Sequence, residues 1–390
     1  MSGPKTGRPP WPRSASAPLV SPLQPSVVYT SEGPDALDAI YGQGSGYTYA
    51  REGHPNADVT AGMIDRLEGA EGGILTGSGM AAVTAALLAV ARAGDHVVGS
   101  DQLYGRSLRL LNETLPGLGI ETSLLETGDA ARVAAALREN TCAVLIETVS
   151  NPTIRIPDIA GIAALCRARG LRLLVDNTFA TPRAFRPFEH GADLVIHSVT
   201  KLLSGHSDTT LGYVAAREAE VRERIVTLAV TMGLTPSPFD AWLAERGLLT
   251  FALRYDRAEA NAAELAGALA GHGGVERVLY PQSPDHPDRA RAVALLGNRG
   301  SHMVSFDIGG GRARAERFIR ELSAIPFAPT LGDVTTTISH PATSSHRGLT
   351  AEAREAHGMG EGFFRVSVGC EEAGAVAPVF LAALNRLRSG

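Results

Sequence analysis

Lysine is nearly absent from this chain, and one of its two lysines lies where it could carry chemistry. Of the 36 basic residues only Lys5 and Lys201 are lysines. Lys201 follows the apolar run LVIHSV (194–199), with Ser198 and Thr200 placed two residues apart just before it. A positioned lysine amine can form an imine with a carbonyl compound, whereas a guanidinium cannot. The pattern suggests covalent chemistry at Lys201, with chance retention in an arginine-rich composition as the alternative.

Two further polar features also follow apolar runs. Asp176 closes LRLLVD (171–176), where it could cap the next segment or face a cationic ring nitrogen, because a buried carboxylate needs a partner. The turn GSGM (77–80) follows GILT (73–76), and its small residues at a helix start could bind phosphate or simply connect two elements. Together, a phosphate-binding turn, a strand-end aspartate and Lys201 point to pyridoxal 5′-phosphate.

These residues require elements that bring them to one edge. Apolar strand-like runs alternate with helical stretches along the first two thirds of the chain. Such alternation predicts an α/β fold with a seven-stranded, mostly parallel sheet that binds its ligand at the carboxyl ends of the strands. The expected strands are 73–76, 96–99, 122–126, 143–149, 171–176, 194–199 and 211–216, and the helices 79–92, 105–115, 129–138, 158–169 and 217–230.

The chain divides into three expected regions. Residues 1–58, rich in Pro, Gly, Ser and Tyr, form an extended arm. Residues 59–241 form the large cofactor-binding domain, and residues 242–390 form a smaller C-terminal α+β domain. In the latter the pattern predicts a long helical segment at 241–271, strands at 302–308 and 363–369, and helices at 312–323 and 374–388.

Composition excludes several classes of function. The net charge is −5 and the arginines are scattered, so we expect no nucleic-acid partner. Three cysteines far apart suggest neither a disulfide framework nor a metal site. The N-terminal residues lack the apolar core of a signal peptide, and the longest apolar run is too short to span a bilayer, so we expect no membrane partner and a cytoplasmic location.

The order of the motifs resembles the Cys/Met metabolism family of pyridoxal-phosphate enzymes. This group includes cystathionine γ-synthase, cystathionine γ- and β-lyases, methionine γ-lyase and O-acetylhomoserine sulfhydrylase. The likeness extends from about residue 22 to the C-terminus. It implies a fold-type I enzyme with pyridoxal 5′-phosphate as cofactor and a small amino acid as substrate. It rests on SGM (78–80), VDNTFATP (175–182), SVTKLLSGHSD (198–208), LGD followed by HPATSSHR, and FFRVSVG (363–369).

The resemblance assigns the cofactor residues. Lys201 would be the Schiff-base lysine and later the proton shuttle, Asp176 would pair with the ring nitrogen, and Tyr104 would stack on the ring and could serve as a base. The phosphate would be held by Ser78, Gly79, Met80, Ser198 and Thr200.

The resemblance also assigns substrate and subunit contacts. Arg365 would bind the substrate α-carboxylate, since its planar fork suits that group. Asn151 would lie near the cofactor's ring oxygen and the substrate carboxylate, and Thr330 would also contact the substrate. Tyr49 and Arg51 would reach the phosphate of the neighbouring subunit, which implies a homodimer with shared active sites, commonly paired into a homotetramer. His206 and His340 are expected to be structural hydrogen-bonding residues.

The shared residues do not choose between β- and γ-chemistry, or between elimination and replacement. Arg109 matches an arginine of cystathionine-handling members, and Arg106 replaces a smaller residue. Pro329 and Thr335 also depart from the family pattern. Both arginines favour a substrate with a second carboxylate and hence a cystathionine γ-synthase or γ-lyase type. The alternatives are a methionine γ-lyase or O-acetylhomoserine sulfhydrylase, a non-catalytic protein of the same fold, and an imine-forming aldolase.

Overall fold

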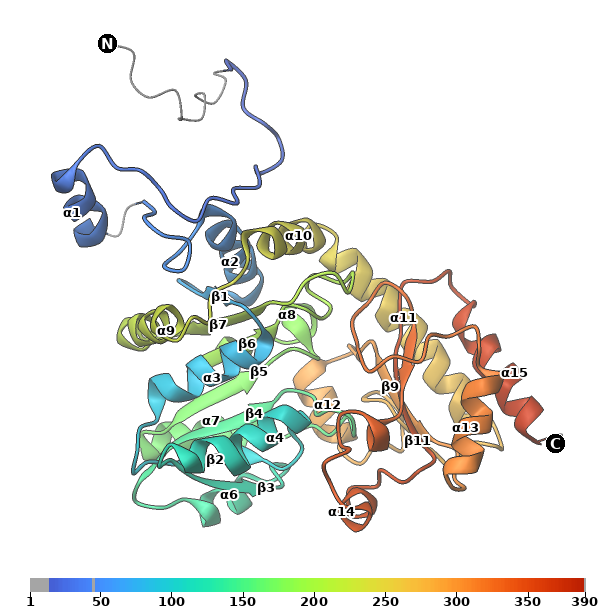
Figure 1. The fold of residues 1–390 in the computed structure, drawn as a ribbon. Coiled ribbons are helices and arrows are strands. Elements are labelled where there is room, and N and C mark those ends of the chain that lie inside the picture. The colour runs from blue at the N-terminus through green and yellow to red at the C-terminus, as the bar shows by residue number, and fades with distance from the viewer. Residues whose placement is uncertain (1–13, 44–45, 389–390) are drawn as a thin grey trace.

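A seven-stranded sheet organises the first part of the chain in the computed structural model, which describes residues 14–43 and 46–388 (Figure 1). The strand order is β1-β7-β6-β5-β4-β2-β3, and β7 alone runs against the other strands of this sheet. The predicted mostly parallel sheet is therefore confirmed. Its strands are β1 (Ile74–Thr76), β2 (His96–Ser100), β3 (Glu121–Leu125), β4 (Thr141–Glu147), β5 (Arg172–Asp176), β6 (Leu194–Ser198) and β7 (Gly212–Ala216).

Both faces of this sheet are buried, because successive side chains of each strand point to opposite sides. On β5, Leu173 and Val175 belong to one apolar core and Leu174 belongs to the other. The first core contains side chains of α2 (Pro55–Glu68), α6 (Ala130–Ala136) and α7 (Ile159–Arg169). The second contains side chains of α3 (Gly79–Val90), the helical run α4 (Gly105–Arg109), η1 (Leu110–Thr114) and α5 (Leu115–Gly117), and α9 (Ala219–Thr231).

A second, antiparallel sheet lies in the C-terminal part, with strand order β10-β11-β9-β8. Its core is rich in phenylalanine, with Phe306, Phe318, Phe364 and Phe380 all fully buried. The strands are β8 (Arg277–Leu279), β9 (Met303–Asp307), β10 (Thr337–Ser339) and β11 (Phe363–Ser367), and α13 (Arg312–Glu321) and α15 (Val376–Arg388) complete the layer. The remaining short helices are α8 (Thr181–Ala184), η2 (Pro187–His190), η3 (Pro341–Thr343) and α14 (Ala351–Ala356).

The helical segment predicted at 241–271 is two helices, α10 (Pro238–Leu248) and α11 (Phe251–Ala270). The side chains of Ala244 and Leu248 lie in a core of the large sheet, so α10 packs with the large domain. Helix α11 passes from one domain to the other, because Tyr255 belongs to the large-sheet core and Leu265 to the small-sheet core. The expected division at residue 242 therefore falls inside α10.

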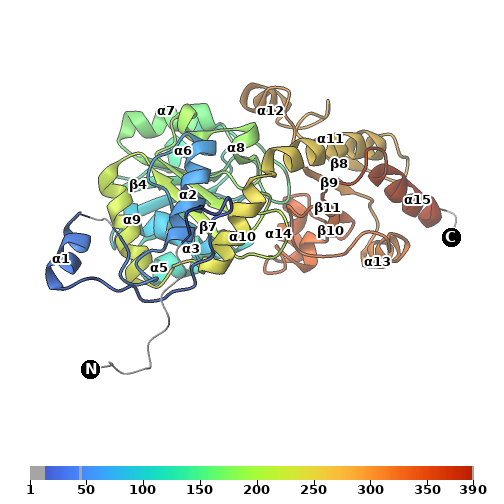
Figure 2. The same ribbon diagram turned by 90° about the horizontal axis from the view of Figure 1, so that it is seen from above.

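The N-terminal arm departs from the body of the molecule, and α1 (Pro34–Gln43) lies at the end opposite α15 (Figure 2). It is anchored where Trp242 Nε1 donates a hydrogen bond to Ser21 O at 2.8 Å. Within the arm, residues 28 and 49 form an isolated bridge. The arm ends before residue 58, since α2 begins at Pro55 and its Ala57 is already buried in the core. Lys5 and the rest of 1–13, together with 44–45, lie outside the described residues.

Among the described residues, no helix is both long enough and apolar enough to cross a membrane. Cys142, Cys166 and Cys370 are free thiols. Burial raises the pKa of Cys142 to about 11 and that of Cys166 to about 12, which keeps both protonated at neutral pH.

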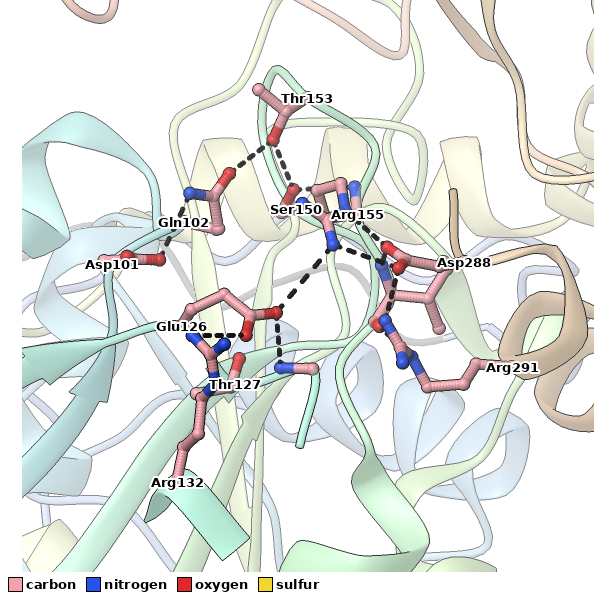
Figure 3. Close-up of polar contacts among 12 residues, drawn as sticks. Asp101, Gln102, Glu126, Thr127, Arg132, Ser150, Thr153, Arg155, Asp288 and Arg291 are labelled. Atoms are coloured by element: carbon pink, nitrogen blue, oxygen red, sulfur yellow. Dashed lines mark hydrogen bonds and ion pairs between the residues drawn. The ribbon is translucent and has the colours of Figure 1, made fainter. Parts of the chain in front are cut away.

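A polar cluster connects the loop that follows β4, in the large domain, to residues of the C-terminal domain (Figure 3). Asp288, just before α12 (Arg289–Leu296), accepts bonds from Arg155 Nε at 2.6 Å and Nη2 at 3.0 Å, and from the Ile156 N–H at 2.9 Å. Arg291 also bonds to this carboxylate. Ser305 Oγ, on β9, donates to the carbonyl of Pro152 at 2.7 Å. The small domain therefore clamps the loop 150–156 onto the large one.

Replacing Asp288 by alanine should lower the free energy of unfolding by about 2–4 kcal/mol at neutral pH, because it leaves Arg155 and Ile156 N–H without their acceptor. Burial alone would raise the pKa of Asp288, but the bonds from Arg155 and Ile156 and the nearby charges hold it below its usual range. The stabilisation is thus full above about pH 3.9 and is lost as the pH falls through the lower folded value.

Urea unfolding of the two proteins at several pH values measures this difference. Asp256→Ala is the matched control, since its partners Arg183 and Arg299 are partly exposed surface groups and exposed pairs contribute less than about 1 kcal/mol. An Asp288→Ala protein no less stable than Asp256→Ala would contradict the clamp.

Candidate active site

A cavity of about 630 Å³ opens at the carboxyl ends of the large sheet, between the two domains. The place at the carboxyl ends is the one predicted for an open α/β sheet, and residues of both domains contribute to the wall. Most of the residues that the sequence singled out are brought together here: Ser78, Gly79, Met80, Tyr104, Asn151, Asp176, Ser198, Thr200, Lys201 and Arg365, together with Arg106, Arg109 and Pro329.

Lys201 lies in the turn that follows β6, where its N–H donates to Ser198 O at 3.1 Å. Burial, and then the positive charge of Arg365, lowers the pKa of its amine. The loop of Gly332 packs directly on this turn. Gly332 has φ +82°, and a Cβ there would lie 2.4 Å from Leu202 N, so a side chain at this position would push the loop away from Lys201.

Asp176 ends β5 and faces the same cavity. Its Oδ1 accepts bonds from the Thr178 hydroxyl at 2.5 Å and from the Thr178 N–H at 3.0 Å. Burial raises the pKa of Asp176, and the two bonds from Thr178 oppose that rise. Thr178 Oγ1 in turn accepts the Ser198 N–H at 2.8 Å, which ties the end of β5 to the end of β6.

A second buried carboxylate, Glu147, ends the neighbouring strand β4 in register with Asp176 and was not foreseen. Its oxygens accept the N–H groups of Tyr104 at 2.6 Å and Asn151 at 3.2 Å. Burial, and then the charge of Asp176, raises the pKa of Glu147 well above its usual range. In the sequence Glu147 is only the last letter of the apolar run AVLIE, so its partners gave no local signal.

The N-terminus of α3 provides an anion-binding end to the cavity. Ser78 caps the helix by accepting the Ala81 N–H at 3.1 Å, which leaves the N–H groups of Gly79 and Met80 available to an anion. A Cβ on Gly79 would lie 2.7 Å from Ser198 Cβ, and glycine therefore permits this close approach. Thr200 Oγ1 already donates to Leu211 O at 3.1 Å and accepts the Leu211 N–H at 2.9 Å, so it borders the site with a committed hydroxyl.

The three residues expected to meet the substrate do lie together. Arg365, on β11, donates from Nη1 to Asn151 Oδ1 at 2.7 Å and from Nη2 to the carbonyl of Thr330 at 2.8 Å. Thr330 thus contributes its backbone rather than its side chain. Burial lowers the pKa of Arg365 to about 10, so the guanidinium stays charged at neutral pH. The acceptors of these two bonds, Asn151 Oδ1 and the Thr330 carbonyl, are both neutral.

Other predicted residues lie differently. Tyr49 and Arg51 are not part of the cavity of their own chain. Arg51 lies over the Tyr49 ring at 5.3 Å and donates to Val230 O at 3.0 Å. Arg109 borders the cavity but pairs with Glu113 at 2.7 Å on an exposed helix face.

The two histidines expected to be structural make hydrogen bonds to nearby groups. His206 Nδ1 lies 2.7 Å from Ser204 O, and His340 lies within 3.0 Å of both Thr343 Oγ1 and Glu361 O, as expected of structural histidines. The cavity also contains Arg347, a basic residue at the end of the HPATSSHR motif to which no role had been assigned.

The residues of the cavity fit pyridoxal 5′-phosphate. They provide a helix N-terminus for a phosphate, a strand-end carboxylate for a ring nitrogen, an aromatic residue at the rim, and an amine whose pKa is lowered. The model of the Cys/Met metabolism PLP-dependent enzymes matches residues 12–385. The chain belongs to this family.

Individual members of the Cys/Met metabolism family are similar to nearly the whole chain. The cystathionine gamma-lyase of Bacillus subtilis is 38% identical over 85% of this chain and 87% of its own. The L-methionine gamma-lyase of Porphyromonas gingivalis is 36% identical over 85% and 83%. The crystal structure of a cystathionine gamma synthase from Xanthomonas oryzae in complex with cystathionine has a TM-score of 0.89 and 36% identity, covering 95% and 94%. Identity alone therefore does not select a substrate.

Family membership makes the protein a PLP-dependent enzyme, and its residues divide the work. The cofactor, when bound, supplies an electron sink that acidifies the substrate Cα–H. Lys201 can then hold or release a proton at its Nζ, because its lowered pKa favours the free amine. Arg365 offers a charged fork for a carboxylate. Asp176, which lines the same cavity, would provide the negative charge that favours a protonated ring nitrogen.

The scarcity of lysine allows the Lys201 amine to be titrated directly. In the cofactor-free enzyme, acylation of Lys201 should reach half its maximal rate at a lower pH than acylation of Lys5, because a lowered pKa exposes the free amine earlier as the pH rises. Arg365→Met should shift the Lys201 profile to higher pH, since it removes a neighbouring positive charge. Mass spectrometry of the peptides measures both rates.

Arg254→Met serves as the control for the loss of a buried arginine, since its bonds go to the carbonyls of Leu202, Leu203 and Gly247. It should leave the Lys201 profile closer to that of the parent than Arg365→Met does. Equal profiles for Lys201 and Lys5 in the parent enzyme would show that the amine is not perturbed.

Proposed function

We propose that the protein catalyses PLP-dependent elimination or replacement at the γ-carbon of an amino acid that carries a second carboxylate, as cystathionine does. The observation that carries the proposal is a pair of exposed arginines, Arg106 and Arg347, in the wall of the cavity. Neither guanidinium has an ion-pair or hydrogen-bond partner among the residues that the structure describes.

The two arginines come from segments that touch. Arg106 is the second residue of α4, and the adjacent Gly105 approaches Ser345 so closely that a Cβ would lie 2.1 Å from its carbonyl oxygen. Arg347 follows two residues after Ser345. Two cations in the cavity wall favour an anionic substituent, and Arg365, which also lines the cavity, is available for the α-carboxylate. Arg109 is the weaker candidate for this role, since Glu113 already neutralises it.

In this arrangement the chain's residues bind, orient and move protons. Arg365 and Asn151 would fix the α-carboxylate, which presents the Cα–H to Lys201. Lys201 would carry the proton between the α-, β- and γ-carbons, as γ-chemistry requires loss of a second proton from Cβ. Tyr104, at the rim with 39% of its surface exposed, would cover the ring. A methionine γ-lyase or O-acetylhomoserine sulfhydrylase would need the same residues, but not the two free arginines.

A substrate panel tests the second carboxylate. The parent enzyme should have a higher kcat/KM for cystathionine than for methionine, with 2-oxobutanoate as the scored product. Arg106→Ala and Arg347→Ala should each lower kcat/KM for cystathionine about tenfold, mainly through KM, because each removes a charge-assisted contact. Their kcat/KM for methionine should change far less.

Arg132→Ala is the control, as its guanidinium is exposed, 3.5 Å from Glu126 and outside the cavity. The panel also includes O-acetyl- and O-succinylhomoserine with and without cysteine, which separates replacement from elimination. A parent enzyme that prefers methionine or O-acetylhomoserine, with no effect of either arginine variant, would refute the proposal in favour of the alternative activities.

We also propose a homodimer with shared active sites, commonly paired into a tetramer, in the cytoplasm. The arm supports a second subunit, because it exposes Leu19, Val20, Val27, Val28 and Tyr41. Tyr49 and Arg51 lie on the surface near α9 and away from their own cavity, where a neighbour's phosphate could be reached. The three free thiols support a reducing compartment.

Subunit complementation tests the shared site. Lys201→Ala and Arg51→Ala enzymes should each be nearly inactive, because one lacks the amine and the other a phosphate contact. Unfolding and refolding them together should restore activity, since a mixed dimer contains one site with both residues intact. Light scattering checks the assembly. Failure of a mixed assembly to recover any activity would contradict sharing of the site.

A further inference from the structure

Glu147 is a buried charged group that the chemistry described above does not use. It ends β4 directly beside Asp176 on β5, and both side chains line the same cavity. Glu147 retains only 8% of its surface exposed. Placing two carboxylates side by side away from water is costly: burial, and then the charge of Asp176, raises the pKa of Glu147, while the bonds from the N–H groups of Tyr104 and Asn151 oppose that rise. A side chain whose burial costs free energy in this way is expected to have a specific role.

The contacts of Glu147 show what its carboxylate does. Oε1 accepts the N–H of Tyr104, which follows β2, and Oε2 accepts the N–H of Asn151, which follows β4. The two distances are 2.6 Å and 3.2 Å. One side chain therefore joins the loop that carries the ring-covering tyrosine to the loop that carries the partner of Arg365.

Only a carboxylate can make this bridge. Both partners are donors, and a glutamine of the same length offers one acceptor oxygen and one donor nitrogen. A backbone N–H left buried without an acceptor costs about 1–3 kcal/mol. The presence of an acid rather than an amide next to Asp176 is thus explained by the need for two acceptors at one point.

Movement of either loop would reach the cofactor site. Tyr104 is followed by Gly105, which packs so closely against the Ser345 carbonyl that a Cβ would not fit. The backbone on the C-terminal side of Tyr104 is therefore held by this contact, and Glu147 holds the N–H of Tyr104 itself. Asn151 Oδ1 accepts the bond from Arg365 Nη1. Glu147 is connected in this way both to the residue at the ring and, through Asn151, to the residue for the substrate carboxylate.

We propose that Glu147 is a positioning residue whose two oxygens fix Tyr104 and Asn151 relative to Asp176, and so set the affinity and the orientation of the bound cofactor. It acts through these residues and does not itself need to touch the substrate. The inference depends on the family's cofactor and not on the second carboxylate of the substrate, so it stands or falls independently of the substrate panel.

The test compares Glu147→Gln with Glu147→Asp. The amide keeps the size but loses one acceptor, and aspartate keeps the charge but is one methylene too short to reach both N–H groups. Each variant should bind PLP about tenfold more weakly in a refilling titration. Each holoenzyme should also show a reduced visible circular dichroism per bound cofactor, because Tyr104 and Asn151 no longer hold the ring in one orientation. KM should rise more than kcat falls, since Arg365 loses its fixed partner.

Glu126→Gln is the matched control. Glu126 directly follows β3, accepts the N–H of Gly128 at 2.9 Å and pairs with arginines outside the cavity. Its visible circular dichroism and its affinity for PLP should equal those of the parent. A Glu147→Asp enzyme that behaves as the parent, while Glu147→Gln does not, would show that charge alone matters and would overturn the bridge. Parent-like behaviour of both would overturn the proposal altogether.

A double-variant cycle separates positioning from general stability. If Glu147 acts through Tyr104, Glu147→Gln should weaken PLP binding much less in a Tyr104→Ala background than in the parent background. A purely structural Glu147 would give the same fold-change in both backgrounds, even if its replacement lowers the melting temperature. Equal fold-changes would therefore reject the role at Tyr104.

Discussion

Burial of charge at one sheet edge is the constraint on which the rest of this structure depends. Asp176 and Glu147 lie beside each other, and the amine of Lys201 and the guanidinium of Arg365 face the same cavity. The protein stabilises these buried groups mainly by hydrogen bonds to neutral partners, such as Thr178, Asn151 and backbone groups. A ligand with a cationic ring nitrogen and a carboxylate completes this arrangement at low cost, because the polar groups are already oriented.

The two domains divide the ligand between them. The large sheet carries Lys201, Asp176 and the helix end suited to a phosphate, while the small sheet carries Arg365. The bond from Arg365 to Asn151 crosses the boundary between the two domains, and Asp288 binds the other end of the same loop at Ile156. Any substrate that engages Arg365 therefore also acts on the contact between the domains.

Residues that end apolar runs could be predicted from the sequence, because strand ends of a parallel sheet converge. Asp176 was predicted in this way, Lys201 by its place after such a run together with the scarcity of lysine, and the seven strands lie close to their expected positions. The bridge by Glu147 could not be predicted, since it depends on β2 and β4 being neighbours in space. Thr330 acts through a carbonyl, which no side-chain pattern reveals. The pair of Arg109 with Glu113, four residues later, was visible in the sequence and weakens the role expected for Arg109.

The near absence of lysine has a consequence for the chemistry of the cofactor itself. PLP is an aldehyde, and free aldehydes condense with any accessible amine on a protein surface. In the region that the structure describes, Lys201 is the only lysine, and the arginines there do not condense with aldehydes. The surface thus offers the aldehyde almost no competing targets, and the amount of colour that the protein acquires should report the number of filled active sites directly.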